Sequence, residues 1–88
     1  MKYKVRINRR IVKGIGRLPV NIQEMLSLLM EDLRDTGPIQ KTWNNFSKLG
    51  KDRYHCHLKY RYAACWKHEK KSIEIEVYYV GSREDAPY

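Results

Sequence analysis

The clearest periodic pattern in this chain is an apolar stripe at helical spacing between residues 19 and 35. Its members recur every three or four positions, as on one face of an α-helix: Ile22, Met25, Leu26, Leu29 and Leu33. Pro19 suits the first turn of such a helix, and Thr36-Gly37-Pro38 stops it. The pattern predicts a helix from Pro19 to about Asp35, with its apolar side in the core.

Two weaker patterns precede this helix. Residues 2–7 alternate polar and apolar side chains in the manner of an edge strand. Residues 9–17 carry apolar side chains at helical spacing, and their basic residues are Arg9, Arg10, Lys13 and Arg17. Gly14 and Gly16 each weaken a helix by up to ~1 kcal/mol relative to alanine. We therefore expect a strand and then a short helix whose basic side chains face solvent or a binding partner.

The second half of the chain has β-type patterns. Residues 39–50 show no clean period, although Trp43, Phe46 and Leu49 could dock on the domain. Runs typical of strands follow at about 52–58, 60–67 and 72–80, and the last alternates regularly from Ser72 to Val80. The short join between the first two runs predicts a tight hairpin near Lys59.

The order of these elements predicts the fold class. A β-α-α-β-β-β order indicates one α+β domain over residues 1–88, in which a helical pair packs on one face of a small, mainly antiparallel sheet. Eighty-eight residues suffice for one modest core and not for two. The other face of this two-layer sandwich is expected to be concave and basic.

Charge changes this picture by indicating a class of partner. Eighteen Lys and Arg against ten Asp and Glu give a formal net charge of +8 and a pI near 9.7. Such an excess favours a polyanionic partner, which could be nucleic acid, an anionic membrane surface or an acidic protein. Basic residues in or beside the expected strands are candidate RNA contacts: Lys48, Lys51, Arg53 and Lys59.

Targeting signals and cysteines suggest the compartment. No apolar run approaches the roughly 20 residues needed to span a bilayer. The first residues alternate and lack the unbroken apolar core of a signal peptide. Cys56 and Cys65 do not form a disulfide scaffold, so we expect a cytoplasmic protein with reduced thiols and no membrane partner.

The residues with the most evident chemistry lie in Tyr54-His55-Cys56-His57-Leu58. In a strand, His55 and His57 share one face, while the other three residues share the opposite face. Histidines beside arginine can move protons and bind phosphate near neutral pH. In a small, very basic chain, RNA is the evident candidate substrate.

With this order of elements, the chain resembles the RelE/ParE superfamily of bacterial toxins over nearly its whole length. RelE-like toxins have a Tyr-x-x-x-Leu strand, a Tyr-Arg-x-x-Tyr strand, and a final strand that ends in Gly-x-Arg with a tyrosine a few residues on. The corresponding segments here are Tyr54 to Leu58, Tyr60-Arg61-Tyr62, Gly81-Ser82-Arg83 and Tyr88.

The resemblance implies a role for each candidate site residue. His55 and His57 fall on the catalytic strand, where lysine-rich members carry two lysines. Arg61 falls on a phosphate-binding arginine and Arg83 on the arginine that stabilises the transition state. Tyr88 falls on the C-terminal tyrosine that stacks on the mRNA base or assists proton transfer. The implied activity is metal-independent cleavage of mRNA, usually in the ribosomal A site, without a cofactor.

The residues are chemically sufficient for this reaction when considered by themselves. Cleavage without metal needs activation of a 2′-hydroxyl, protonation of the leaving 5′-oxygen, and cations that offset charge on the phosphorane. Neutral histidine can accept the first proton, and arginine supplies paired donors to phosphate oxygens. The sequence does not decide which histidine acts as the base and which as the acid. Of the two assignments, we favour His57 as the base.

Other interpretations of the same residues remain open. A His-x-His pair with Cys56, Cys65 and His68 nearby is also a metal pattern, but Cys56 should face away and no carboxylate or third histidine completes the set. A ParE-like inhibitor of DNA gyrase would share the fold without needing the histidines and arginines. A non-catalytic nucleic-acid-binding domain would need only the charge.

The family resemblance also implies partners. A cognate antitoxin is expected, together with mRNA and the ribosome. We expect the free toxin to be a monomer and the toxin bound to antitoxin to be a hetero-oligomer.

Overall fold

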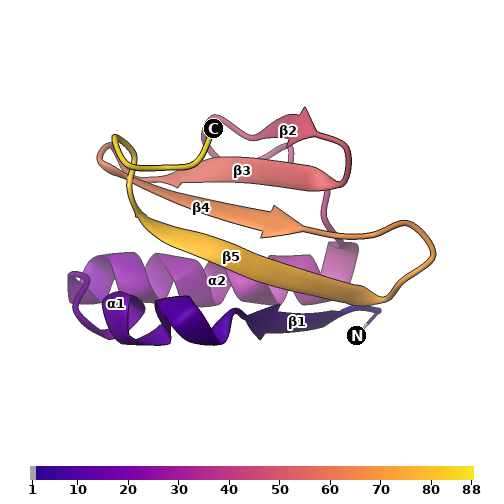
Figure 1. Cartoon of the computed structure of the whole chain (residues 1–88), viewed down its shortest axis with the longest axis horizontal. Helices are drawn as coiled ribbons and strands as arrows, with labels where there is room; N and C mark the ends of the chain where they lie inside the picture. Colours follow the sequence, from indigo (N-terminus) through magenta and orange to yellow (C-terminus); the bar gives the residue numbers. More distant parts are fainter. Residues whose placement is uncertain (1) are drawn as a thin grey trace.

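The computed structural model places a helical layer against one face of a five-stranded sheet (Figure 1). It describes residues 2–88; Met1, the first residue of the expected domain, lies outside the described residues. The elements are β1 (Lys4–Ile7), the 3-10 turn η1 (Arg9–Ile11), α1 (Val12–Gly16), α2 (Val20–Thr36), β2 (Ser47–Gly50), β3 (Arg53–Leu58), β4 (Tyr62–Lys67) and β5 (Glu74–Ser82). The predicted α+β fold is confirmed, and the structure adds the short strand β2 in the segment without a clean period.

The strands lie in the order β1-β5-β4-β3-β2. β1 runs parallel to β5, and the other neighbours are antiparallel. The first strand of the sequence is thus held by the last one, as Figure 1 shows. The predicted hairpin is present between β3 and β4, where Leu58 pairs with Tyr62 and Lys59 adopts a φ of 61°.

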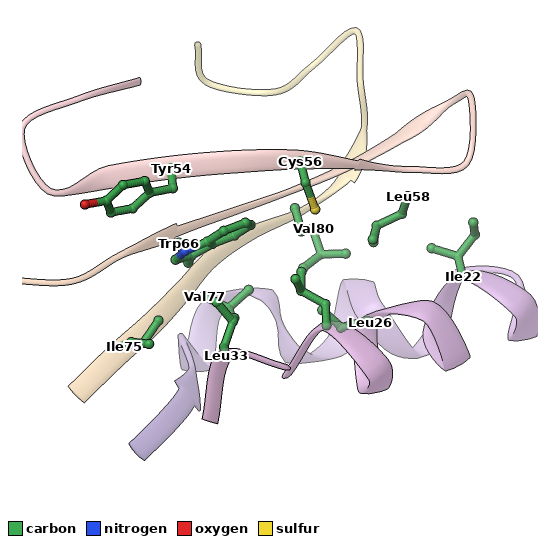
Figure 2. Close-up of a cluster of buried hydrophobic side chains, with 12 residues drawn as sticks. Ile22, Leu26, Leu33, Tyr54, Cys56, Leu58, Trp66, Ile75, Val77 and Val80 are labelled. Carbon is green, nitrogen blue, oxygen red and sulfur yellow. The ribbon is translucent and has the colours of Figure 1, made fainter. Parts of the chain in front are cut away.

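The core lies between α2 and the sheet (Figure 2). Four members of the predicted stripe are buried, and Met25 is half-buried at its margin. On the sheet side Trp66 is fully buried, and its indole N–H donates a 3.0 Å hydrogen bond to the carbonyl of Pro38. Trp43 and Phe46 pack against this cluster, so the irregular segment after α2 closes one side of the core.

A bulge in β5 interrupts the expected alternation. Val77 pairs with Trp66 and Tyr79 pairs with Cys65, which leaves Tyr78 as the additional residue. Val77 and Val80 therefore both belong to the core, while the Tyr78 ring lies under the guanidinium of Arg53 on the other side of the sheet. The bulge adds aromatic area to the face that the helices leave open.

Candidate active site on the open face of the sheet

The two histidines of β3 lie on the face of the sheet opposite the helices. Tyr54, Cys56 and Leu58 alternate with them and belong to the core, as predicted. The ring centroids of His55 and His57 are 5.5 Å apart, with an angle of 63° between the ring planes. The alternation of side chains along β3 thus brings the two imidazoles together on the face opposite the helices.

His55 is the enclosed member of the pair. Only 7% of its surface is exposed, and its Nδ1 atom lies 3.0 Å from Oγ of Ser47 on β2. Burial lowers the pKa of His55, and a hydrogen bond with Ser47 offsets part of this effect. The ring is therefore fixed in orientation and neutral near pH 7.

His57 lies where β2 no longer pairs with β3. Pairing of β2 reaches only His55, through Ser47, and beyond it the backbone N–H of His57 donates a 2.7 Å hydrogen bond to the carbonyl of Asn44. Burial lowers the pKa of His57, and the positive charge of Arg83, together with that of His55 when it is protonated, lowers it further. A half-exposed, neutral imidazole is suited to accept a proton at neutral pH.

Arg83 lies beside His57 just after β5. Its backbone N–H donates a 2.7 Å hydrogen bond to the carbonyl of Arg61, which ties the end of β5 to the β3–β4 hairpin. His57 and Arg83 together line a cleft of about 520 Å³. Within residues 2–88 the ion pairs both involve Glu76, so the guanidinium of Arg83 has no carboxylate partner.

Arg61 points to a neighbouring cleft rather than to the one that contains His57. That second cleft is also about 520 Å³ in volume, and Arg83 borders both. The structure therefore brings Arg83 to His57 and places Arg61 one step further along the surface.

Tyr88 covers the other histidine. Its ring centroid lies 4.3 Å from that of His55, with the planes tilted by 41° (the returning C-terminal segment is visible above β3 in Figure 1). Burial and the nearby Cys65 raise the pKa of Tyr88, while Arg83 opposes this effect. The phenol is thus protonated near neutral pH and lies next to the histidine pair.

The four expected RNA contacts are not brought together. Lys59 lines the cleft with His57 and Arg83. Arg53 shares the histidine face, but its guanidinium lies 5.3 Å from the centroid of the Tyr78 ring. Lys48 pairs with Tyr54 and so projects from the opposite face, and Lys51 lies in the turn between β2 and β3.

Sequence analysis missed the residues that hold the histidines in place. Ser47 and Asn44 both lie in the 39–50 segment, which has no period from which their positions could be read. Tyr60 begins the strand predicted for residues 60–67, but in the structure it lies in the turn between β3 and β4, and 87% of its surface is exposed. The available signal for its exposure is that Lys59 and Arg61 flank it, next to the hairpin predicted near Lys59.

The alternative metal pattern is not assembled in the folded chain. Cys56 lies in the core, on the face opposite His55 and His57. In the described part of the chain, no three His, Cys, Asp or Glu side chains are grouped so as to hold a metal ion. Residues 2–88 also contain no helix with the length and apolar character required to cross a bilayer.

Comparison with solved structures identifies the fold. No protein-family model and no curated protein matches the sequence. The archaeal RelE of the RelE–RelB complex from Pyrococcus horikoshii OT3 is similar to this chain with a TM-score of 0.77 and 19% identity, over 98% of this chain and 100% of that one. The chain has the RelE fold.

Two further structures share this RelE fold. The isolated RelE toxin of E. coli matches with a TM-score of 0.75 and 18% identity, over 97% of this chain and 88% of that one. A chain of the YoeB–YefM complex from Staphylococcus aureus matches with a TM-score of 0.72 and 7% identity, over 94% and 99%. The resemblance inferred from the sequence motifs is therefore confirmed at the level of the fold.

Proposed function

We propose that this chain is the toxin of a toxin–antitoxin pair and that it cleaves mRNA on the ribosome. The observation that carries the proposal is the joint presence of His57 and Arg83 in one cleft of a RelE fold. A proton acceptor and a free guanidinium are the groups that RNA cleavage requires at the scissile phosphate.

His57 acts as the general base in this proposal. Its neutral imidazole takes the proton of the ribose 2′-hydroxyl, and the resulting oxygen attacks the adjacent phosphorus. The bond from phosphorus to the 5′-oxygen then breaks, so the products carry a 2′,3′-cyclic phosphate and a 5′-hydroxyl. The lowered pKa of His57 supports this role, because the imidazole is neutral at pH 7 and can accept a proton directly.

Arg83 stabilises the charge that builds up on the phosphorane, and Arg61 binds a neighbouring phosphate. Removal of one such donor typically slows an enzyme by roughly 10²–10³-fold. Tyr88 supplies the proton to the leaving 5′-oxygen. The raised pKa of its phenol, which keeps the hydroxyl protonated, supports this role. The chemistry uses side chains alone and requires neither metal nor cofactor.

His55 acts as a positioning residue in this scheme. Its burial, its contact with Ser47 and the overlying ring of Tyr88 support a role in holding the tyrosine rather than in proton transfer. We propose that Lys48, Lys51, Arg53 and Lys59 add non-specific attraction to RNA, with Lys59 closest to the reacting phosphate.

The proposed partners are the ribosome, mRNA and a cognate antitoxin. Similar chains have been crystallised with antitoxins, as in the RelE–RelB and YoeB–YefM complexes. The net charge of +8 supports an anionic RNA substrate. We propose that the free toxin is a cytoplasmic monomer and that it forms a hetero-oligomer with its antitoxin.

A translation reaction tests the proposal directly. Purified protein is added to mRNA with and without ribosomes, in the presence and absence of a metal chelator, and the mRNA ends are mapped by primer extension. We expect cuts that require ribosomes and leave 5′-hydroxyl ends. Cutting should continue when the chelator is added after translation has been stalled. His57→Ala should reduce cutting about 10²–10⁴-fold and Arg83→Ala about 10²–10³-fold.

Lys70→Ala serves as the matched control, because it removes one exposed positive charge in the β4–β5 turn, which lies at the opposite end of the sheet from the β3–β4 hairpin (Figure 1). Its cutting rate should equal that of the unaltered protein. Absence of cuts from folded protein that still arrests bacterial growth would refute the nuclease proposal, and gyrase would then be assayed as the target.

A further inference from the structure

We propose that the cleft beside His57 is a nucleobase pocket, in which Tyr60 stacks on the base and Glu24 reads its edge. This inference rests on the proposed nuclease function and names the part of the RNA substrate that the cleft accepts. It assigns roles to Tyr60 and Glu24, which the proposed catalytic steps do not use.

The cleft exists because β2 is short. β2 pairs with β3 only as far as His55, so the remaining edge of β3 is not covered by a strand. The cleft is formed there by the β3–β4 hairpin, the turn at Asn44 and Asn45, and the first half of α2. A volume of about 520 Å³ lies within the range of pockets that enclose small ligands.

Tyr60 is the strongest sign of a ligand. It is the most exposed large hydrophobic residue of the described chain, at 87%, although it lies in a tight hairpin rather than in a loose terminus. Lys59 and Arg61 flank it in sequence, and its ring borders both the cleft with His57 and the cleft with Arg61. Proteins commonly bind single-stranded nucleic acid with exposed aromatic rings, which stack on the bases, and with neighbouring cations, which contact the phosphates.

The opposite wall of the cleft is apolar. Leu28 is 56% exposed and Met25 half-exposed, and both line the cleft from α2. A flat base inserted beside Tyr60 would cover this apolar surface, while Lys59 and Arg83 at the rim would contact its phosphates. This charge arrangement favours a nucleotide over an acidic peptide, whose carboxylates would meet Glu24 inside the cleft.

The polar lining of the cleft implies a preference among bases. Asn21, Asn44 and Asn45 provide amides, and Glu24 provides a carboxylate that accepts hydrogen bonds but donates none. Adenine, cytosine and guanine each offer an exocyclic amino group to such an acceptor. Uracil has no exocyclic amino group, and its one donor on this edge, N3–H, lies between two carbonyl oxygens that a carboxylate repels, so the pocket should select against uracil.

Binding of non-cleavable 2′-O-methyl dinucleotides tests the inference without requiring activity. Titrations followed by NMR should show shifts at the amides of Leu28, Asn44 and Asn45, with CpC bound more tightly than UpU. Tyr60→Ala should weaken binding at least fivefold, which is the lower limit for loss of one stacking contact. Tyr60→Trp should restore binding, because it retains a stacking ring.

Glu24→Gln should reduce the difference between CpC and UpU, since an amide can also donate to a carbonyl of uracil. Ile73→Ala is the control, because Ile73 is 54% exposed and directly precedes β5, whose start lies at the end of the sheet away from the β3–β4 hairpin (Figure 1). Unchanged dinucleotide binding in Tyr60→Ala, or shifts confined to other regions, would overturn the inference. Loss of antitoxin affinity alone would instead assign the cleft to a protein partner.

Cleavage mapping distinguishes this inference from the proposed function. If the unaltered protein cuts mRNA and Glu24→Gln cuts with the same base distribution, the nuclease stands and the base pocket is wrong. If the unaltered protein cuts no mRNA, the nuclease proposal fails, and dinucleotide binding alone decides whether the pocket exists.

Discussion

The ring of Tyr88 lies over the ring of His55, with 4.3 Å between their centroids. This contact joins the C-terminal segment to β3 and covers a histidine that is otherwise reached only from the open face of the sheet. Loss of the ring in Tyr88→Ala should expose His55 to water and raise its pKa toward 6.5, because burial is the main cause of the lowered value.

An NMR titration of the His55 ring measures this change. Tyr88→Phe provides the comparison, since it keeps the cover and removes only the hydroxyl. The pKa of His55 should remain low in Tyr88→Phe, while mRNA cleavage should slow in both variants. A normal cleavage rate in Tyr88→Phe would show that the Tyr88 hydroxyl does not donate the proton to the leaving oxygen.

The pair formed by His57 and Arg83 predicts a pH dependence. Because a neutral His57 is required, the cleavage rate should rise with pH, with a midpoint below the ordinary histidine pKa of 6.5. Removal of the guanidinium in Arg83→Ala takes away a charge that lowers the pKa of His57, so this pKa should increase. NMR titration of the His57 ring in both proteins checks the direction, and an unchanged pKa would show that the two groups are not coupled.

Glu76 should make stability depend on acidity. Its carboxylate accepts a 2.7 Å hydrogen bond from Asn8 and one of 3.1 Å from Arg6, and it lies 3.6 Å from Nζ of Lys67. The hydrogen bond from Asn8, followed by the charges of Lys67 and Arg6, lowers the pKa of Glu76 below its usual 4.5, although burial opposes this. The stabilisation is therefore complete above about pH 4.5 and is lost as the pH falls through the lowered pKa.

Glu76→Gln keeps a carbonyl that can accept from Asn8 but cannot titrate. Urea unfolding between pH 3 and 7 should show a smaller decrease in stability at acid pH for this variant than for the unaltered protein. Glu76→Ala should cost about 1–3 kcal/mol at pH 7, because it leaves the Asn8 amide without its partner. Parallel pH profiles for all three proteins would contradict the role assigned to this carboxylate.

Two glycines should respond oppositely to alanine. Gly37 ends α2 with a φ of +92°, and a Cβ atom there would lie 2.8 Å from the Tyr3 ring. Gly14 lies within α1, and a Cβ atom there meets nothing within 4 Å. Gly37→Ala should therefore lower the free energy of unfolding by at least about 1 kcal/mol, whereas Gly14→Ala should raise it by about 0.5–1 kcal/mol. Thermal unfolding of both variants measures the two signs.

The strongly periodic parts of the fold were predictable from sequence. The stripe on α2 and the alternation in β3 fix which side chains enter the core, and they correctly placed His55 and His57 on one face. Sequence periodicity reports such faces because burial repeats with the geometry of the element. The hairpin near Lys59 was also predictable from the short distance between two strand-like runs.

Other features depend on contacts that have no local signal. β2 contains Ser-Lys-Leu-Gly, which is a weak strand sequence, and it is a strand because β3 offers a free edge. The bulge at Tyr78 and the stacking of Tyr88 on His55 likewise arise from tertiary pairing. The cleft beside His57 combines a helix, a turn and a hairpin, so no single segment of the sequence could reveal it.

The parallel pairing of β1 with β5 has a consequence for synthesis. A ribosome makes β1 first and β5 after every other element, so the two strands can join only when nearly all of the described chain has been translated. Arg83 and Tyr88 emerge later still, and both contribute to the histidine site. A nascent chain therefore carries its histidines in an incomplete sheet until β5 and the residues after it have been translated.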